Sequence, residues 1–350
     1  MMIERERLSA AYRRFAEGEA RGRSPLYEAL AHGVADDPAV LGFLETLPHA
    51  KQQPNLLFAA VRFLSGTPAG WEELRAAVLD NAAAVRTTML ERSTQTNEPG
   101  RCATLLPVLA LLPQPLALIE VGASAGLCLL PDRYGYDYEG RRVRPPDETL
   151  QPPVFPCAVD AKTPLPAACP QIVWRAGLDL NPLDVADRDQ MAWLKTLVWP
   201  EQTGRRDRLD AAIRIAAAEP PRLVRGDLRH DLATLCSQAP GDATLVVFHT
   251  AVLAYVTDPA ERAAFAGAMP SLCDFWIANE APHVFLEVAA RTSAGAMGRE
   301  LDTTRTPIGG GRFLLSVNGQ PFGWADPHGA WLDWVANPPA SNRDWNRTPV

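Results

Sequence analysis

The chain has 350 residues, of which 47% are hydrophobic and 21% charged, a composition typical of a globular protein with a substantial core. At roughly 150 residues per domain, this length predicts about two domains. The formal net charge is −7, from 34 Lys+Arg and 41 Asp+Glu. Proteins that bind nucleic acid usually carry a basic excess instead. We therefore expect no nucleic-acid partner.

The sequence also argues against a membrane protein and a disulfide scaffold. The first residues are charged, and no run approaches the roughly 18 apolar residues of a spanning helix. From this we expect a cytoplasmic protein with no membrane partner. The six cysteines are too sparse for a disulfide framework, and none forms a Cys-x-x-Cys pair. We expect no metal site.

Residues 1–112 are predicted to form a helical N-terminal cap. Apolar residues recur at helical spacing over 56–64, and a second such pattern covers 71–79. Thr96 and Asn97 precede an acid and a proline, which is the pattern of a helix start. We expect that helix to include Leu105 and Leu109.

Residues 113–350 are predicted to form a Rossmann-like α/β domain. Short apolar runs alternate with helical runs, which favours βαβ units and a mostly parallel sheet covered on both faces. An Asn-Gly pair near the end predicts an antiparallel C-terminal hairpin over 312–324. The predicted strands are 116–119, 172–174, 222–224, 244–248 and 284–288, and the predicted helices are 190–197, 206–218 and 259–268.

A proline-rich insertion is predicted at about 131–170. Residues 145–170 contain eight of the 32 prolines and show no periodic pattern. Long irregular segments of this kind in a compact domain are often functional. We interpret the insertion as a lid or a surface wrap.

A glycine-rich turn follows the first predicted strand and leads into a helical run. Glycines there let backbone N–H groups approach a ligand closely. The string is Glu120-Val-Gly122-Ala-Ser124-Ala-Gly126. It resembles the acid-x-Gly-x-Gly-x-Gly motif of class I S-adenosylmethionine-dependent methyltransferases, with a serine as the middle residue. It also fits Gly-x-Ser-x-Gly, the nucleophile elbow of α/β-hydrolases. A turn without a ligand is the third interpretation.

The surrounding sequence favours the methyltransferase interpretation. That motif gives Glu120 a role at the methionine amino end of the cofactor, whereas a hydrolase elbow needs no acid there. A hydrolase would also need a His-Gly-Gly-Gly type oxyanion loop, which the upstream sequence lacks. Asp227, His249 and His328 still leave a catalytic triad open. The cofactor that the resemblance implies is S-adenosylmethionine.

The methyltransferase resemblance predicts acids at the ends of two further strands. Asp179, in a Gly-Leu-Asp-Leu-Asn-Pro string, is placed to bind a ribose, and Asp227 with Leu228 is placed near an adenine. In such folds the second acid follows about 20 residues after the turn. The separation here is 179 − 120 = 59 residues. Either 131–170 is an insertion, or Asp179 is not the ribose acid.

Three residues are candidates for acting on a small-molecule methyl acceptor. His249 and Tyr255 lie at and after the fourth predicted strand, and Glu98 lies at a helix start. A buried core histidine and a simple helix cap are the plainer interpretations of His249 and Glu98. Asn97 and Arg101 flank Glu98, where they suit a carboxylate-bearing substrate.

Six strings recur together across the chain. They are Gln53-Pro-Asn-Leu-Leu57, Thr96-Asn-Glu98 with Arg101, Ile119-Glu-Val-Gly-Ala-Ser-Ala-Gly-Leu127, Asp132-Arg-Tyr-Gly-Tyr136, Gly177-Leu-Asp-Leu-Asn-Pro182 and Trp199-Pro-Glu201. With these strings the sequence resembles an uncharacterised bacterial family, domain of unknown function 2332. The resemblance covers nearly the whole chain and implies no substrate. Two alternatives to methyl transfer therefore stay open: a repurposed core that catalyses elimination or cyclisation, and a non-catalytic partner subunit. The partner would be another protein or a second copy of the chain in a homodimer.

Overall fold

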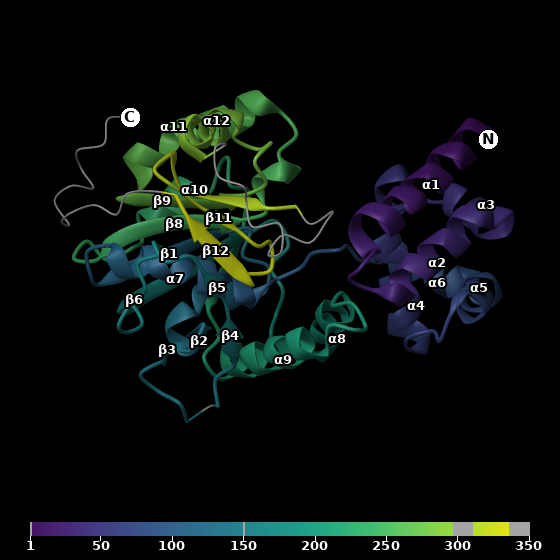
Figure 1. The fold of residues 1–350 in the computed structure, drawn as a ribbon, viewed down its shortest axis with the longest axis horizontal. Helices are drawn as coiled ribbons and strands as arrows, with labels where there is room; N and C mark the ends of the chain where they lie inside the picture. The colour runs from purple at the N-terminus through teal and green to yellow at the C-terminus, as the bar shows by residue number, and fades with distance from the viewer. Residues whose placement is uncertain (1, 150, 297–310, 336–350) are drawn as a thin grey trace. The chain divides into compact units, whose positions relative to one another are not determined.

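The computed structural model describes residues 2–149, 151–296 and 311–335. These residues divide into two compact units (Figure 1). The chain passes from the first unit to the second at Asn97, earlier than the predicted boundary at 112, because the helix over 102–111 packs within the second unit. The first unit contains 2–96 and 188–207, and the second contains 97–187, 208–296 and 311–335.

The first unit is helical, as predicted for the N-terminal region. The predicted helices over 56–64 and 71–79 are confirmed as α4 and α5. Side-chain caps start α2 and α3, where Ser24 and Asp37 accept hydrogen bonds from backbone N–H groups of the first turn. The helices are α1 (Met2–Phe15), α2 (Pro25–Asp36), α3 (Pro38–Glu45), α4 (Pro54–Ser65), α5 (Trp71–Asp80), α6 (Ala82–Glu91) and α8 (Arg188–Thr196), with a π-helical turn at Ala16–Ala20 and a 3-10 turn at His49–Lys51.

An aromatic cluster around Phe58 forms the centre of this unit. The Phe58 ring is fully buried on α4, and its centroid lies 6.2 Å from that of Tyr12, 6.1 Å from that of Phe15 and 4.9 Å from that of Tyr27. The later helix α8 joins the same core through Trp193. Residues distant in sequence therefore complete the helical unit.

The second unit is built on a large sheet. Five adjacent strands are parallel, in the order β7-β6-β1-β8-β9, and the sheet continues antiparallel through β10, β11 and β12 before the short β5. This confirms a mostly parallel sheet. The strands are β1 (Leu116–Val121), β5 (Ala158–Val159), β6 (Ile172–Asp179), β7 (Arg222–Arg225), β8 (Thr244–Thr250), β9 (Phe275–Glu280), β10 (Phe313–Val317), β11 (Gln320–Ala325) and β12 (Trp331–Trp334).

Helices cover both faces of the parallel strands. On one face, α10 (Leu232–Cys236) and α11 (Pro259–Leu272) pack on Val121 and its neighbours. On the other, α7 (Cys102–Leu111) approaches β9, where Thr104 Oγ1 lies 3.5 Å from Asn279 Nδ2. Such cover explains why β1 is buried along its whole length. The chain also forms α9 (Thr203–Ala218) and α12 (Leu286–Ala296).

The C-terminal part of the sheet confirms one prediction and corrects another. Asn318 and Gly319 both have positive φ (47° and 72°), as a type I′ hairpin turn between β10 and β11 requires. The predicted strand over 284–288 is wrong, because those residues lead into α12, and the strand is β9. Val284 and Val288 are buried four residues apart while Leu286 is exposed, which is helical periodicity.

The proline-rich insertion contains a small sheet of its own. Its strands are β2 (Gly135–Tyr138), β3 (Arg141–Val143) and β4 (Val154–Pro156). Three buried tyrosines fix it to the chain nearby, because Tyr134, Tyr136 and Tyr138 donate hydrogen bonds to the carbonyls of residues 127, 131 and 103. These tyrosines pack the insertion against α7 and the segment after the glycine-rich turn.

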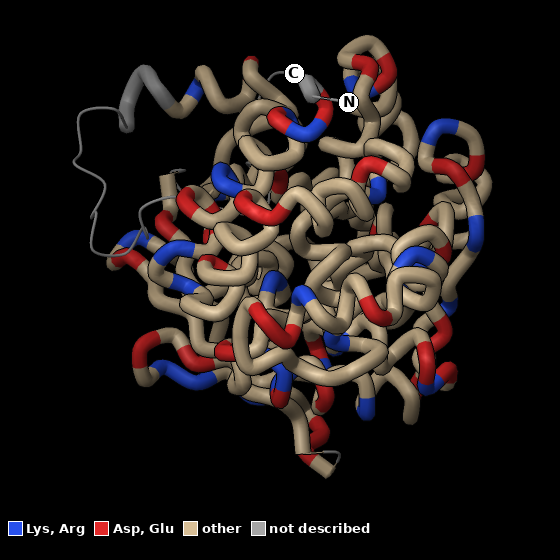
Figure 2. The backbone as a smooth tube through the Cα atoms, turned by 90° about the vertical axis from the view of Figure 1, so that its right-hand side faces the viewer, with Lys and Arg blue, Asp and Glu red and all other residues tan. Residues whose placement is uncertain are grey.

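Charged residues of both signs are interspersed along the chain (Figure 2). Among the described residues, none of the helices is both long and apolar enough to cross a bilayer. The described ranges also hold no group of three or more His, Cys, Asp or Glu arranged for a metal ion.

Replacing Phe58 with alanine should destabilise the helical unit by about 3–5 kcal/mol, because it removes a fully buried ring and leaves a cavity among three other aromatic rings. Urea denaturation followed by tryptophan fluorescence measures the change. Leu64→Ala on the same helix is the control, since Leu64 is 42% exposed. Equal losses in the two variants would contradict the assignment of Phe58 to the core.

Candidate functional site

Four of the predicted site residues lie at the carboxyl ends of adjacent parallel strands. Glu120 is near the end of β1, Asp179 ends β6, Asp227 follows β7, and His249 is near the end of β8. Because these strands are parallel neighbours, the four residues share one edge of the sheet. Ligands of open α/β sheets bind outside this edge.

The register divides these residues between the two faces of the sheet. Glu120 pairs with Gly177, so the side chains of Glu120 and Asp179 lie on the same face, that of α7. His249 pairs with Val121, so its side chain lies on the opposite face, with α11. The structure therefore groups the two acids and separates His249 from them.

The glycine-rich turn has the predicted backbone but not the predicted helix after it. Gly122, Ser124 and Gly126 all have positive φ (70°, 53° and 71°). Two 3-10 turns follow, at Leu127–Leu129 and Pro131–Arg133, where the sequence predicted a helical run. Pro131 explains the difference, because the residue before a proline is disfavoured in the α conformation. Too few residues then remain between Gly126 and Pro131 to form a helix.

Asp179 holds the turn in place. Its carboxylate accepts hydrogen bonds from the N–H of Ser124 at 2.8 Å and from the N–H of Asn181 at 2.7 Å. Ser124 in turn accepts a hydrogen bond at its carbonyl from the N–H of Leu183. One carboxylate at the end of β6 thus orders both the turn after β1 and the segment that follows β6.

Glu120 is buried in this site with an unsatisfied oxygen. The residue is 1% exposed, and its Oε2 has no hydrogen-bond partner among the described residues. Burial raises the pKa of Glu120 well above its ordinary value, and the neighbouring Cys128 adds to the rise, whereas the charge of Arg101 opposes it. The site therefore favours the protonated carboxyl, or a hydrogen-bond donor placed against Oε2.

The segment from Asn97 to Arg101 binds to the turn and to a neighbouring strand. Asn97 accepts a hydrogen bond at Oδ1 from the N–H of Leu127, at 2.8 Å. Arg101 donates from Nη1 to the carbonyl of Thr250, at the end of β8, at 3.0 Å. Asn97 and Arg101 are each 7% exposed, so this buried segment joins the turn to the edge of the sheet.

Glu98 caps a short turn, as the plainer of its two interpretations expects. Its Oε1 accepts a hydrogen bond from the N–H of Gly100 at 3.0 Å and caps a 3-10 turn at Pro99–Arg101. The predicted helix start at Thr96 and Asn97 is thus replaced by a cap at Glu98, and α7 begins only at Cys102. Capping occupies one oxygen of the carboxylate.

His249 is sealed inside the opposite face. Trp276 donates its indole N–H to Nε2 at 2.9 Å, and Nδ1 lies 2.6 Å from Oε1 of Glu280. An indole nitrogen only donates, so Nε2 is the acceptor and the imidazole proton sits on Nδ1. Glu280 also accepts the N–H groups of Val252 and Leu253. The catalytic role of His249 stays a prediction. In this arrangement its ring contacts Glu280, and Glu280 in turn binds the loop after β8.

Three further predicted residues lie near the same edge without meeting the acids. Tyr255 is 79% exposed in a 3-10 turn at Leu253–Tyr255. Asp227 is bound by the guanidinium of Arg229, which is the main reason that its pKa falls to about 2. Leu228 packs, partly buried, against the core under α10 and α11.

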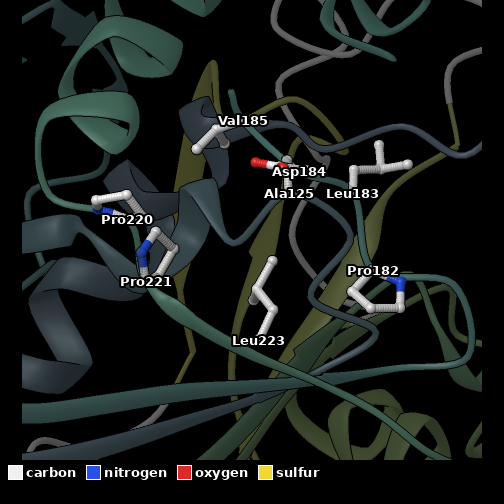
Figure 3. A pocket seen from close by; sticks show the side chains of 8 residues that line it. All are labelled: Ala125, Pro182, Leu183, Asp184, Val185, Pro220, Pro221 and Leu223. Carbon is white, nitrogen blue, oxygen red and sulfur yellow. The ribbon is translucent and has the colours of Figure 1, made fainter. Parts of the chain in front are cut away.

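A small pocket lies beside the turn (Figure 3). Its volume is about 290 Å³, just below the usual 300–1,000 Å³ of ligand pockets. Asp184 contributes the only charged side chain among the lining residues. The pocket is formed by Ala125, Pro182, Leu183, Asp184, Val185, Pro220, Pro221 and Leu223.

The comparison with known families agrees with the resemblance seen in the sequence. Residues 9–334 match the model of family DUF2332, described as an uncharacterized protein conserved in bacteria. The chain belongs to this family. No curated protein and no solved structure matches it.

In this family member, sequence reasoning missed two residues that the fold brings to this edge of the sheet, and it named a third, His328, only as a possible member of a hydrolase triad. Thr250 and Glu280 lie at the ends of β8 and β9, and β9 itself was not predicted. His328 lies in the loop between β11 and β12, and its Nδ1 is 3.7 Å from Oε2 of Glu98. The only local signal was a strand-end position for the first two, and nothing local connects His328 with Glu98.

The raised pKa of Glu120 predicts a measurable pH dependence. The unfolded carboxyl ionises near pH 4.5, whereas the folded one keeps its proton to higher pH, so the folded state loses stability as the pH rises above that value. Glu120→Gln removes this loss. The variant should therefore gain stability relative to the unaltered protein between pH 5 and pH 7, by up to about 1.4 kcal/mol per pH unit.

Urea unfolding at several pH values tests this prediction. Glu91→Gln, an acid-to-amide change at an exposed position of α6, is the control and should show a constant difference. A constant difference for Glu120→Gln as well would show that the carboxyl is ionised in the folded protein.

Proposed function

We propose that this protein binds S-adenosylmethionine at the carboxyl edge of its parallel strands and transfers the methyl group to a small molecule. The observation that carries the proposal is where the glycine-rich turn leaves the sheet. Along β7-β6-β1-β8-β9 the chain order reverses between β1 and β8, and the turn follows β1 directly. Nucleotide-type ligands bind at such a reversal.

The residues at this edge suit the groups that such a cofactor presents. Oε2 of Glu120 and Oγ of Ser124 are buried and have no hydrogen-bond partner within the part of the chain that the structure describes. An ammonium group supplies donors for both. Asp179 stands on the next strand, where a carboxylate suits ribose hydroxyls. When bound, the sulfonium of the cofactor supplies an electrophilic methyl group.

The chain's own contribution is to order the site and to position the acceptor. Asp179 and Asn97 hold the turn from two sides through its backbone N–H groups. Methyl transfer requires in-line placement of the two reactants, and fixed backbone of this kind supplies it. The binding energy would come from the turn and the acids, since no helix follows to contribute a dipole.

The long separation between Glu120 and Asp179 is compatible with the proposal. Within residues 131–159, the chain forms β2, β3 and β4 of the small sheet and then β5 at one end of the large sheet. It next enters β6, which pairs with β1. Asp179 therefore stands where a second-strand acid is expected, even though it lies 59 positions after Glu120. The insertion interpretation of the proline-rich segment supports the proposed ribose role.

The hydrolase alternative gains no comparable support. Ser124 has a positive φ, as an elbow serine does, but its Oγ has no hydrogen-bond partner among the described residues. His249, a candidate base at the end of β8, uses both ring nitrogens on Trp276 and Glu280. A nucleophile needs a base within hydrogen-bond reach.

Thermal unfolding with S-adenosylhomocysteine tests the proposal. A ligand that binds only the folded state adds about 2.7 kcal/mol of stability at a hundredfold excess over its Kd, so we expect a higher Tm. Glu120→Gln should reduce this increase, because an amide cannot carry the negative charge that an ammonium group favours. Glu91→Gln should leave it unchanged.

An unchanged Tm at millimolar S-adenosylhomocysteine and S-adenosylmethionine would contradict the proposal. In that case a Tm increase with another nucleotide would indicate a repurposed site. Labelling of Ser124 by a fluorophosphonate would instead establish a hydrolase.

A further inference from the structure

The loop between β11 and β12 packs closely on the segment that carries Glu98. A Cβ at Gly329 would overlap the carbonyl oxygen of Gly100, and one at Gly100 would overlap the carbonyl oxygen of His328. Arg101 also donates from Nε to the carbonyl of Pro327 at 2.8 Å. Backbone meets backbone here, so the two segments are held at a fixed separation.

The loop itself has a defined conformation. Asp326 Oδ1 accepts hydrogen bonds from the N–H of His328 at 2.8 Å and of Ala330 at 3.2 Å, which is an Asx-type turn. Gly329 takes the left-handed φ of 84° that this turn needs. The position of His328 is thus set by the turn and by the contact with Gly100.

The accessible ring of His328 lies next to the buried carboxylate of Glu98. Nδ1 lies 3.7 Å from Oε2 of Glu98, whose side chain is 5% exposed, while the side chain of His328 is 44% exposed. In enzymes that use histidine as a base, a buried carboxylate behind one ring nitrogen orients the imidazole and stabilises its charged form. Such contacts are often long without ligand and shorten when it binds.

Another His–Glu pair in the described part of the chain shows what distinguishes this one. His249 and Glu280 are 0% and 2% exposed, and Trp276 covers the other ring nitrogen of His249. A proton cannot reach that ring from a bound molecule without breaking the core. His328 also faces a buried glutamate, but its own ring is accessible to solvent.

We propose that His328 and Glu98 form a proton-transfer site that acts on a small molecule carrying an O–H or N–H group. The proton passes from the heteroatom of that molecule to Nε2 of His328, and the heteroatom keeps the electron pair and becomes a nucleophile. His328 is the catalytic residue, and Glu98 is a positioning residue that stabilises the imidazolium. The proposal does not depend on the identity of the cofactor.

The position of this pair relative to the turn suits such a role. Cys128, just after the glycine-rich turn, donates from Sγ to the carbonyl of Glu98 at 3.3 Å. Arg101 links the same segment to Thr250 at the end of β8. The pair therefore lies at the edge of the sheet where the acids Glu120 and Asp179 gather.

Carbethoxylation by diethyl pyrocarbonate, mapped by peptide mass spectrometry between pH 5 and pH 8, tests the pair without a substrate. The reagent attacks only the neutral imidazole, so the rate at each histidine reports its titration. Because Glu98 favours the charged ring, Glu98→Gln should move the midpoint of His328 down by about 0.5–1 pH unit. The exposed His230 is the internal control and should not move.

Two results would overturn the proposal. One is a His328 midpoint that does not respond to Glu98→Gln, and the other is a His328 that is not modified while His230 is. His328→Asn should leave the Tm increase with S-adenosylhomocysteine unchanged, since the residue acts on the acceptor. The failure of cofactor binding and the failure of the His328–Glu98 pair are thus seen in separate measurements.

Discussion

The rest of the site depends on the hydrogen bonds that the buried guanidinium of Arg101 donates. A guanidinium stays charged at any physiological pH, and burying it is costly unless hydrogen bonds and opposite charges surround it. Here it donates hydrogen bonds to the carbonyl oxygens of Thr250 and Pro327. Its charge also opposes the rise in the pKa of Glu120 that burial causes. Satisfying one cation therefore keeps the end of β8 and the loop between β11 and β12 together.

Much of the fold could be predicted because local patterns carry the information. The continuous apolar run at 116–119 becomes β1, and the Asn-Gly pair becomes the hairpin turn with positive φ at both residues. Failures occurred where the pattern was short. Residues 284–288 look like a strand by composition but alternate in burial as a helix does, and the helix expected after Gly126 is stopped by Pro131.

The candidate site could be predicted only as far as the parallel strands extend. Acids at strand ends are visible in the sequence, and parallel pairing brings Glu120 and Asp179 to one edge. The contact between Glu98 and His328 joins positions 230 residues apart across a turn and a hairpin loop. No periodicity or spacing encodes such a pair, because it depends on how Gly100 and Gly329 allow two backbones to meet.

The alternation of side chains along a strand limits which residues can act on one ligand. Glu120 and His249 stand on opposite faces of the sheet, so a molecule bound against Glu120 is separated from His249 by the strands themselves. Any proton acceptor that serves the face of Glu120 must come from α7, from the segment before it, or from a loop that packs there. Among the described histidines, His328 meets this condition through the contact between its loop and the segment of Glu98. The geometry of the sheet, more than the identity of any motif, is thus the reason to look for the proton acceptor in the loop between β11 and β12.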